Sequence, residues 1–302
     1  MKYSMMFTTH EPYRENQAGY KMISPTTVAD MHIHSPASDG TMTPAEIVAQ
    51  LVEKDIGICS LTDHNSIANQ DLFLKLAGEN GLHAIAGVEI SSKIETMVYH
   101  ILAYGFNPAD KRIPRFVDPI LSMMEETNRE LIIRMSDDYS QINIDEYDSY
   151  VPYENSGGWK SVQYLYSKGF SDTPLDALSY YRKYSLHMSR CDYFSPQEVI
   201  EEIHSWGAFA ILAHPNGYFR GFEPSAGEIM DLFDQMKSYG IDGIEGYYPT
   251  HSQLMTETAA KWCMDNEMML TVGCDSHGDF VPEREIGKIR VPLGMLNLGS
   301  LI

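Results

Sequence analysis

Histidines and carboxylates interrupt an apolar, strand-like segment near the N-terminus in a pattern that suits metal binding. The stretch DMHIHSPASDG (residues 30–40) places His32 and His34 two positions apart, and Asp39 follows in the next loop. Alternate residues of a strand point to the same face, so both imidazole rings can bind one ion. Imidazoles and ionised carboxylates are costly to bury together unless cations neutralise the charge. The residue types therefore predict a metal site, and mixed nitrogen and oxygen ligands favour Mn, Fe or Zn.

The same residue types recur where other strand-like segments end. A lone histidine is more often a core or surface residue, and we assign that role to His10, His83, His187 and His204. For nine side chains at the carboxyl ends of predicted parallel strands, that explanation would require several independent accidents. Barrels and open α/β sheets build their sites at that end, which favours the metal interpretation. The six further positions are His64 in TDH, Glu89 in GVEIS, His100 in VYHILAYGF, His214 in LAHP, and Asp275 and His277 in CDSH.

Strand-like and helix-like segments alternate along most of the chain. TPAE at 43–46 and SPQE at 195–198 each combine an N-cap hydroxyl, a proline at the first helical position and a capping-box glutamate. Repeated strand–helix units with nearly continuous apolar strands predict parallel strands covered by helices, in a barrel or a doubly wound sheet. The expected strands span 28–35, 56–64, 83–91, 98–106, 208–215, 241–248 and 268–278, and the expected helices 43–55, 67–79, 195–206, 227–240 and 251–265.

Composition limits the classes of protein that the chain can belong to. With 302 residues, of which 43% are hydrophobic, the chain can bury a large core. A net charge of −20 disfavours binding to duplex nucleic acid, although small phosphates can still bind beside metal ions. Four widely spaced cysteines favour a reducing compartment. We find neither a signal peptide nor a membrane-length apolar run, so we expect a soluble, cytoplasmic protein. The oligomeric state stays open.

The middle of the chain breaks the alternating pattern. Residues 107–194 are rich in Tyr, Asp and Ser, and we predict an inserted, mainly helical, cap-like subdomain of short helices and loops. Residues 28–106 and 195–302 would form the barrel, after an N-terminal extension at 1–27. The insert's tyrosines could stack on a nucleobase, but we expect them to pack over the mouth of the barrel. These tyrosines are Tyr147, Tyr150, Tyr153, Tyr180, Tyr181 and Tyr184.

The ordered motif series resembles the PHP (polymerase and histidinol phosphatase) superfamily. The matching segments are DMHIHSPASDGTMTPAEIV, SLTDHNS, GVEIS, His100, AHPNGY and GCDSHGD, which together span most of 28–106 and 195–293. GIEGYYPTHS (243–252) is most similar to the stand-alone members that act on nucleotides. The resemblance implies a distorted (β/α)7 barrel with a trinuclear metal centre. One ion would take His32, His34, Glu89 and Asp275; a second would share Glu89 and add His100 and His214; the third would take Asp39, His64 and His277.

The resemblance also implies hydrolysis of phosphate esters. Such esters resist attack because their anionic oxygens repel a nucleophile, and divalent cations remove that barrier. We expect a metal-bridging hydroxide to attack phosphorus in small phosphomonoesters, preferably nucleoside monophosphates or 3′,5′-bisphosphonucleotides. A 5′–3′ exonuclease on short RNA or DNA oligonucleotides and a histidinol-phosphate phosphatase are the alternatives. A non-enzymatic metal-binding module would predict missing ligands, and all nine positions are filled.

Further candidates surround the predicted ligands. Asp30 and Asp63 would orient ligand histidines, although Asp63 in TDHNS could equally be a turn or cap residue. His251 could protonate the leaving oxygen or could simply begin a surface helix. Arg190 corresponds to a basic residue that faces the phosphate in relatives, and a surface arginine is the equal alternative. Relatives often carry an arginine before the tyrosine of the HP motif, where this chain has Gly217. The candidate catalytic set is Asp63, His251 and Arg190, and the candidate phosphate or substrate contacts are Arg190, Tyr218, Arg220 (in place of Gly217) and His251.

Overall fold

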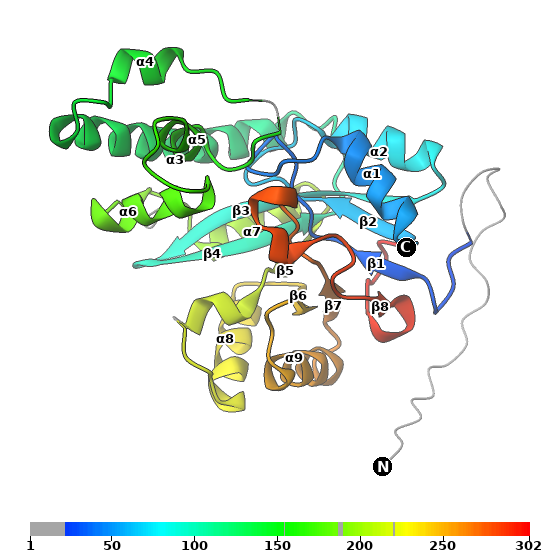
Figure 1. Cartoon of the computed structure of the whole chain (residues 1–302). Helices are drawn as coiled ribbons and strands as arrows, with labels where there is room; N and C mark the ends of the chain where they lie inside the picture. The colour runs from blue at the N-terminus through cyan, green and yellow to red at the C-terminus, as the bar shows by residue number, and fades with distance from the viewer. Residues whose placement is uncertain (1–21, 154, 187–189, 220) are drawn as a thin grey trace.

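The computed structural model describes residues 22–153, 155–186, 190–219 and 221–302. Within these ranges eight strands form one sheet in the order β7-β6-β5-β4-β3-β2-β1-β8 (Figure 1). The first seven strands thus follow each other around the sheet in chain order. The strands are β1 (Val28–Asp30), β2 (Ile58–Leu61), β3 (His83–Ile94), β4 (Met97–Tyr104), β5 (Phe209–Leu212), β6 (Gly243–Tyr247), β7 (Met269–Val272) and β8 (Val291–Pro292).

The two ends of the seven-strand series meet. The backbone N–H of Met31 donates to the carbonyl of Val272 at 3.0 Å, and that of His34 donates to Ser276 at 2.8 Å. The segment after β1 therefore pairs with the segment after β7 and closes the barrel. This confirms the expected distorted seven-stranded barrel, and the two-residue β8 adds an antiparallel partner along β1.

One strand runs against the predicted direction. We expected parallel strands throughout, but β4 is antiparallel to both β3 and β5. The cause is the connection between β3 and β4, which consists of Glu95 and Thr96 alone. Two residues suffice for a hairpin, whereas a parallel crossover needs about a dozen or more. His100 consequently lies inside β4, opposite Ser91, and not at the carboxyl end of a parallel strand.

Helices cover the barrel where the capping signals predicted them. The capping boxes of Thr43 with Glu46 and of Ser195 with Glu198 are both present, and α2 begins three residues later than expected. Figure 1 shows α1 and α2 on one side of the sheet and α8 and α9 on another. Among the described residues, no helix is both long and apolar enough to cross a membrane. The barrel helices are α1 (Pro44–Glu53), α2 (Gln70–Glu79), α7 (Pro196–Ser205), α8 (Ala226–Ser238) and α9 (Gln253–Asp265).

The insert contains a long helix that we did not predict. Helix α3 (Arg112–Asp138) has 27 residues, whereas short helices and loops were expected. Its apolar positions continue across the whole length: Ile113 and Val117 pack with the barrel core, and Leu131 and Met135 pack in a second core. The frequent polar residues between these positions hid that periodicity. The smaller helices of the insert are α4 (Ile144–Ser149), α5 (Lys160–Ser167) and α6 (Ser179–Lys183).

The second core is formed by the insert together with Phe280, which follows β7. Tyr147 and Tyr181 are buried in it, so packing is the use of these two tyrosines, while Tyr153 is largely exposed. Figure 1 shows α3 to α6 gathered on one side of the barrel, beside the β3–β4 hairpin. The domain boundaries at residues 107 and 194 stay predictions.

Candidate metal centre

A single buried carboxylate lies among five imidazole rings. Glu89, near the middle of β3, is fully buried, and both of its oxygens contact histidine nitrogens from other strands or the segments that follow them. This arrangement makes Glu89 the bridge between separate groups of ligands. Its Oε1 lies 2.9 Å from His100 Nδ1 and 2.9 Å from His214 Nε2, and its Oε2 lies 3.1 Å from His32 Nε2, 3.3 Å from His34 Nε2 and 3.0 Å from His64 Nδ1.

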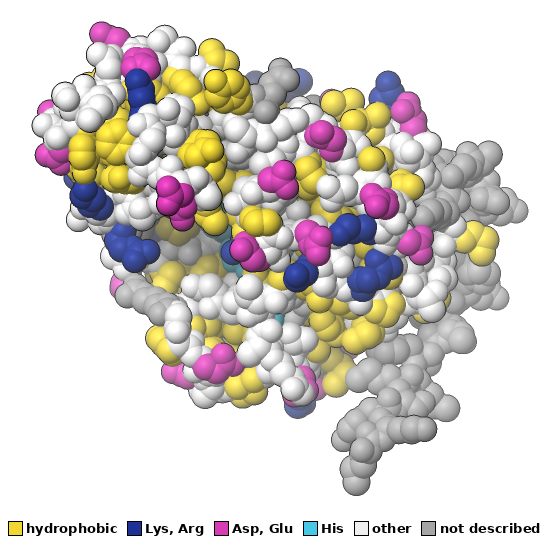
Figure 2. Space-filling view, viewed as in Figure 1, with side chains coloured by type: hydrophobic (Ala, Val, Ile, Leu, Met, Phe, Trp, Pro, Cys, Tyr) yellow, Lys and Arg dark blue, Asp and Glu magenta, His cyan; other side chains and the backbone are white. Residues whose placement is uncertain are grey.

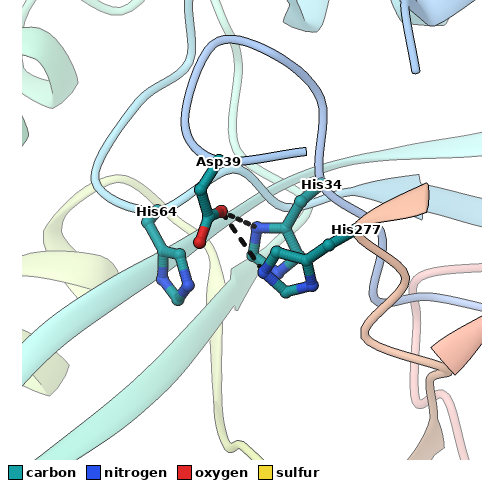
Figure 3. A group of neighbouring side chains, drawn as sticks. All are labelled: His34, Asp39, His64 and His277. Carbon is teal, nitrogen blue, oxygen red and sulfur yellow. Dashed lines mark ion pairs between the residues drawn. The ribbon is translucent and has the colours of Figure 1, made fainter. Parts of the chain in front are cut away.

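Two aspartates complete the set on either side of His34. Asp275 Oδ1 lies 3.0 Å from His34 Nε2 and 3.4 Å from His32 Nε2. Asp39 Oδ1 lies 3.2 Å from His277 Nε2 and 3.8 Å from His34 Nδ1, and Figure 3 shows its carboxylate with these two rings on one side and His64 on the other. The structure therefore brings all nine predicted ligands together. In Figure 2 only small areas of histidine are visible on this face.

The donor set fits divalent cations. Four buried atoms that face one another find no hydrogen-bond partner among the described residues: His34 Nε2, Asp39 Oδ1, His64 Nδ1 and Asp275 Oδ1. Burial alone would lower the pKa of His34, but the negatively charged carboxylates of Asp275 and Glu89 beside it raise it to about 10. The pKa of Glu89 is held well below its usual range against the effect of burial, because histidines surround it. Cations would satisfy these atoms without requiring protons on the rings.

Three ligand groups can each hold an ion. Within each group the nitrogen and oxygen atoms lie within 4.8 Å of one another. His34, His64 and Glu89 each belong to two groups, so the groups share side chains and lie next to one another. The groups are His32, His34, Glu89 and Asp275; His34, Asp39, His64 and His277; and His64, Glu89 and His100.

The carboxylate that orients a ligand histidine is not one of those we predicted. Glu245 in β6 is fully buried, and its Oε1 lies 3.0 Å from His32 Nδ1. Asp30 was expected in this role, but its oxygens accept from the backbone N–H groups of Cys274 and Gly287. The backbone N–H of His32 also donates to Asp30, and the orienting role of Asp30 stays a prediction. A buried acid in the apolar segment GIEGYY was the available signal for Glu245.

Asp63 acts on the loop that carries Asp39. Its carboxylate accepts from the backbone N–H and the hydroxyl of Ser35, both at 2.7 Å, and from Ser38 Oγ at 2.8 Å. Ser38 Oγ in turn lies 3.4 Å from His34 Nδ1, so Asp63 reaches a ligand ring only through Ser38. Burial raises the pKa of Asp63 to about 6.

An arginine that we did not single out contacts the centre. The guanidinium of Arg284 forms an ion pair with Asp275 Oδ2, and its carbon lies 5.6 Å from the centre of the Tyr248 ring. Tyr248 donates its hydroxyl to the same oxygen at 2.8 Å. Arg284 ends a short 3-10 turn (Pro282–Arg284) nine residues after Asp275. Its side chain is 33% exposed, so the guanidinium can also meet a ligand.

Of the remaining predicted residues, some lie beside the candidate ligands and others lie away from them or outside the described residues. Arg190 is half-exposed, with its guanidinium 3.9 Å from Glu130 of α3. The Tyr218 hydroxyl accepts from the His100 N–H at 3.0 Å and donates to the Ala213 carbonyl at 2.9 Å, so it holds backbone beside two ligands. Arg220, His10 and His187 lie outside the described residues, and His204 pairs with Asp242 at 2.8 Å.

His251 is a neutral imidazole beside the centre. Its Nδ1 lies 3.1 Å from the Gly246 carbonyl, which makes Nδ1 the donor and leaves Nε2 as the acceptor. Nε2 is buried and has no hydrogen-bond partner among the described residues. Burial lowers the pKa of His251 to about 4, so a proton on Nε2 is rare at neutral pH. This electrostatic state opposes the predicted role as proton donor to a leaving oxygen.

The insert reaches the centre through Gly158 and Trp159. The Gly158 N–H donates to the Asp39 carbonyl at 2.8 Å, and the Trp159 ring centre lies 6.1 Å from that of His64. Trp159 also lines a cavity of about 320 Å³ between the insert and the loop after β1. Other lining residues include Pro36, Ser38 and Tyr153. Sequence reasoning missed Trp159, since no motif marks it.

Comparisons with known proteins show the family and the fold of the chain. The family model described as "PHP domain" matches residues 30–244. A Haemophilus influenzae protein named 5′-3′ exoribonuclease is 26% identical over 252 residues, covering 82% of this chain and 89% of the relative. A Chromobacterium violaceum protein named 3′,5′-nucleoside bisphosphate phosphatase is 23% identical over 273 residues, covering 85% and 90%. A crystal structure from Bifidobacterium adolescentis, named as a candidate metal-dependent phosphoesterase, shares the fold with a TM-score of 0.72 at 21% identity, covering 88% and 93%.

Proposed function

The chain belongs to the PHP domain family and is a metal-dependent hydrolase of phosphate esters, and we propose that its substrates are small phosphomonoesters, nucleotides above all. The observation that carries the proposal is the set of nine side chains that includes Glu89, whose two oxygens lie within 3.3 Å of five imidazole nitrogens. Nucleoside monophosphates and 3′,5′-bisphosphonucleotides are the preferred substrates.

The three groups of ligands support three divalent ions. Six buried carboxylates lie in or beside the centre, and Arg284 contributes one positive charge, which leaves a net charge of −5. Two divalent ions would leave one negative charge and three would leave one positive charge, so the charge fits either number. One ion would be held by His32, His34, Glu89 and Asp275, a second by Glu89, His100 and His214, and the third by Asp39, His64 and His277. The six carboxylates are Asp30, Asp39, Asp63, Glu89, Glu245 and Asp275.

The protein's own groups would orient the ester at this centre. Bound divalent cations supply positive charge for the phosphoryl oxygens and lower the pKa of water. Arg284 offers guanidinium N–H groups beside Asp275, where they can donate to a phosphoryl oxygen. His251, neutral with a free Nε2, is suited to accept a hydrogen bond from the substrate. Arg190 remains a candidate contact for an anionic group farther from the reacting phosphorus.

The cavity lined by Trp159 supports a nucleotide substrate. Its volume of about 320 Å³ is at the lower end of the range, roughly 300–1,000 Å³, of pockets that hold small ligands. Trp159 supplies an aromatic face for a base, and Ser38 and Asn155 supply polar groups. A space of this size suits one nucleoside attached to the reacting phosphate.

Exonuclease activity on short oligonucleotides is the second candidate. The relative named 5′-3′ exoribonuclease favours it, because its match extends over 82% of this chain. The net charge of −20 disfavours long polyanions, while a short strand could still enter by its end. Histidinol phosphate is a third substrate to test.

Metal analysis and activity assays on the purified protein would distinguish between these functions. Bound Mn, Fe and Zn would be measured by mass spectrometry, and phosphate release would be assayed with mononucleotides, bisphosphonucleotides, histidinol phosphate and short RNA. We expect phosphate release from nucleotides to be the fastest. Mononucleotide release from RNA at comparable efficiency would favour the exonuclease, and fewer than two bound ions in fully active protein would overturn the polynuclear site.

A histidine substitution tests the centre itself. His34→Ala should abolish turnover and lower the bound metal, since His34 contacts both Asp275 and Glu89. His204→Ala is the matched control, because that ring pairs with Asp242 on the outside of the barrel. Unchanged activity in His34→Ala would contradict the proposal.

A further inference from the structure

Glu245 touches ligands that belong to two different metal positions. It is fully buried in β6, and its two oxygens are used separately. Oε1 lies 3.0 Å from His32 Nδ1, and Oε2 accepts the backbone N–H of His214 at 2.8 Å. Since His32 and His214 would hold different ions, one side chain links the two positions.

The contact with His32 sets the tautomer of that ring. An ionised carboxylate can only accept, so the proton of His32 must lie on Nδ1. In the neutral ring that can bind a metal, the lone pair of Nε2 is then directed toward the space beside Glu89 and Asp275, which lie 3.1 and 3.4 Å away. A metal ligand needs this free Nε2, and the carboxylate partner keeps it free.

The contact with His214 stabilises an unusual backbone conformation. His214 has a backbone φ of 29°, a positive value that residues other than glycine rarely adopt. Its N–H is held by Glu245, which offsets part of the conformational cost and directs Nε2 to within 2.9 Å of Glu89 Oε1.

Close packing keeps the Glu245 carboxylate in place. A Cβ atom at Gly273 would lie 2.5 Å from Glu245 Oε1 and 2.1 Å from His32 Cβ. The absence of a side chain at Gly273, directly after β7, therefore lets the backbone approach both residues.

We infer that Glu245 is a positioning residue that couples the metal position of His32 to that of His214. It fixes the tautomer of one ligand and the backbone of the other, so losing its charge weakens both positions together. This inference rests on the metal binding proposed above, but not on the identity of the substrate.

Glu245→Gln tests the coupling with little change in shape. The amide oxygen can still accept from the His214 N–H, but it holds that group more weakly than a charged carboxylate oxygen does, and the amide nitrogen then faces His32 Nδ1. Satisfying that donor moves the ring proton to Nε2, where it blocks a metal. Removal of such a partner typically lowers metal affinity by about tenfold to a hundredfold. We expect that loss at two positions at once, while the ion held by Asp39, His64 and His277 stays.

The measurement is a metal titration of the chelator-treated protein, with the tautomer of His32 read by nitrogen NMR of 15N-histidine-labelled protein. The result expected is two weakened sites and a shifted His32 tautomer. Loss of the His32 position alone, or an unchanged titration, would overturn the coupling. Tyr104→Phe is the control, because it removes the buried hydrogen bond from Tyr104 to the Met31 carbonyl without touching an imidazole.

A second variant covers the case in which Glu245→Gln does not fold. Glu245→Asp keeps the charge but is one methylene too short to span both partners. It should weaken one or both of the two positions and leave the third intact, and three unchanged affinities would overturn the inference. Wild-type protein that binds metal but releases no phosphate would refute the proposed function and leave this inference standing.

Discussion

Docking of the insert on the metal centre depends on one glycine. Gly158 has φ of +70°, and its N–H donates to the Asp39 carbonyl at 2.8 Å. A Cβ atom there would lie 2.5 Å from Val162 Cγ2 and 2.8 Å from Phe280 Cε2. Val162 and Phe280 are both buried, so neither can move away cheaply. Gly158→Ala should therefore destabilise the contact between the insert and the loop that carries Asp39.

The expected cost has two parts. A non-glycine residue in the left-handed region costs about 1–2 kcal/mol. Overpacking of a buried site adds about 1–3 kcal/mol, so the free energy of unfolding should fall by about 2–5 kcal/mol in total. Gly169→Ala provides a matched control, because Gly169 has φ of +75° and no described atom lies within 4 Å of its added Cβ. The control should show the first cost alone.

Urea denaturation followed by tryptophan fluorescence measures both variants. We expect Gly158→Ala to be less stable than Gly169→Ala by about 1–3 kcal/mol. Gly158→Ala should also bind less metal, through displacement of Asp39, whereas Gly169→Ala should bind as much as the wild type. Equal stability and equal metal content in the two variants would refute the docking argument.

Three other substitutions test separate parts of the site. Trp159→Ala should raise KM for nucleotides about tenfold, since base–aromatic stacking contributes about 1–3 kcal/mol. KM for ribose 5-phosphate, which has no base, should stay unchanged, and an equal rise for both substrates would contradict a base contact. Arg284→Met should weaken competitive inhibition by inorganic phosphate about tenfold or more, with bound metal unchanged, and loss of metal without loss of inhibition assigns Arg284 to Asp275 alone. Burial lowers the pKa of His251 to about 4, so its ring stays neutral in the folded protein at pH values where the unfolded protein already binds a proton. The contribution of His251 to the free energy of unfolding is therefore lost as pH falls from about 6.5 to 4. The stability difference between wild type and His251→Gln should change by about 3 kcal/mol over that window, and a constant difference in urea midpoints would refute the assignment.

Local signals in the sequence predicted much of the site. His32 and His34 follow from the period of a strand, and the helix starts at Thr43 and Ser195 follow from side chains three residues apart. These features depend on neighbours in the chain, so a single sequence contains them. The ordered motif series then connected the separate strand ends into one expected centre.

The features that we missed depend on contacts between distant segments. Glu245 and His32 are 213 positions apart, and no spacing rule relates them. Arg284 lies only nine residues from Asp275, but the short turns between them set its direction. The two-residue connection at Glu95 would have predicted the antiparallel direction of β4 if we had located the ends of β3 and β4 more accurately. Helix α3 was hidden because its polar residues outnumber the apolar ones that face the two cores.

The centre is built so that protons and metal ions compete for the same atoms. In the metal-free chain, carboxylates raise the pKa of His32 well above its usual range, and that of His34 to about 10, although burial opposes both shifts. Protons on these rings then neutralise part of the negative charge of Glu89 and Asp275. The same nitrogens must lose those protons before they can bind a cation, because only the neutral ring offers a lone pair. An arrangement that binds metal tightly therefore leaves the charge of the buried carboxylates poorly neutralised when the metal is absent. For that reason, the stability of this end of the barrel depends on whether the metal needed for catalysis is bound.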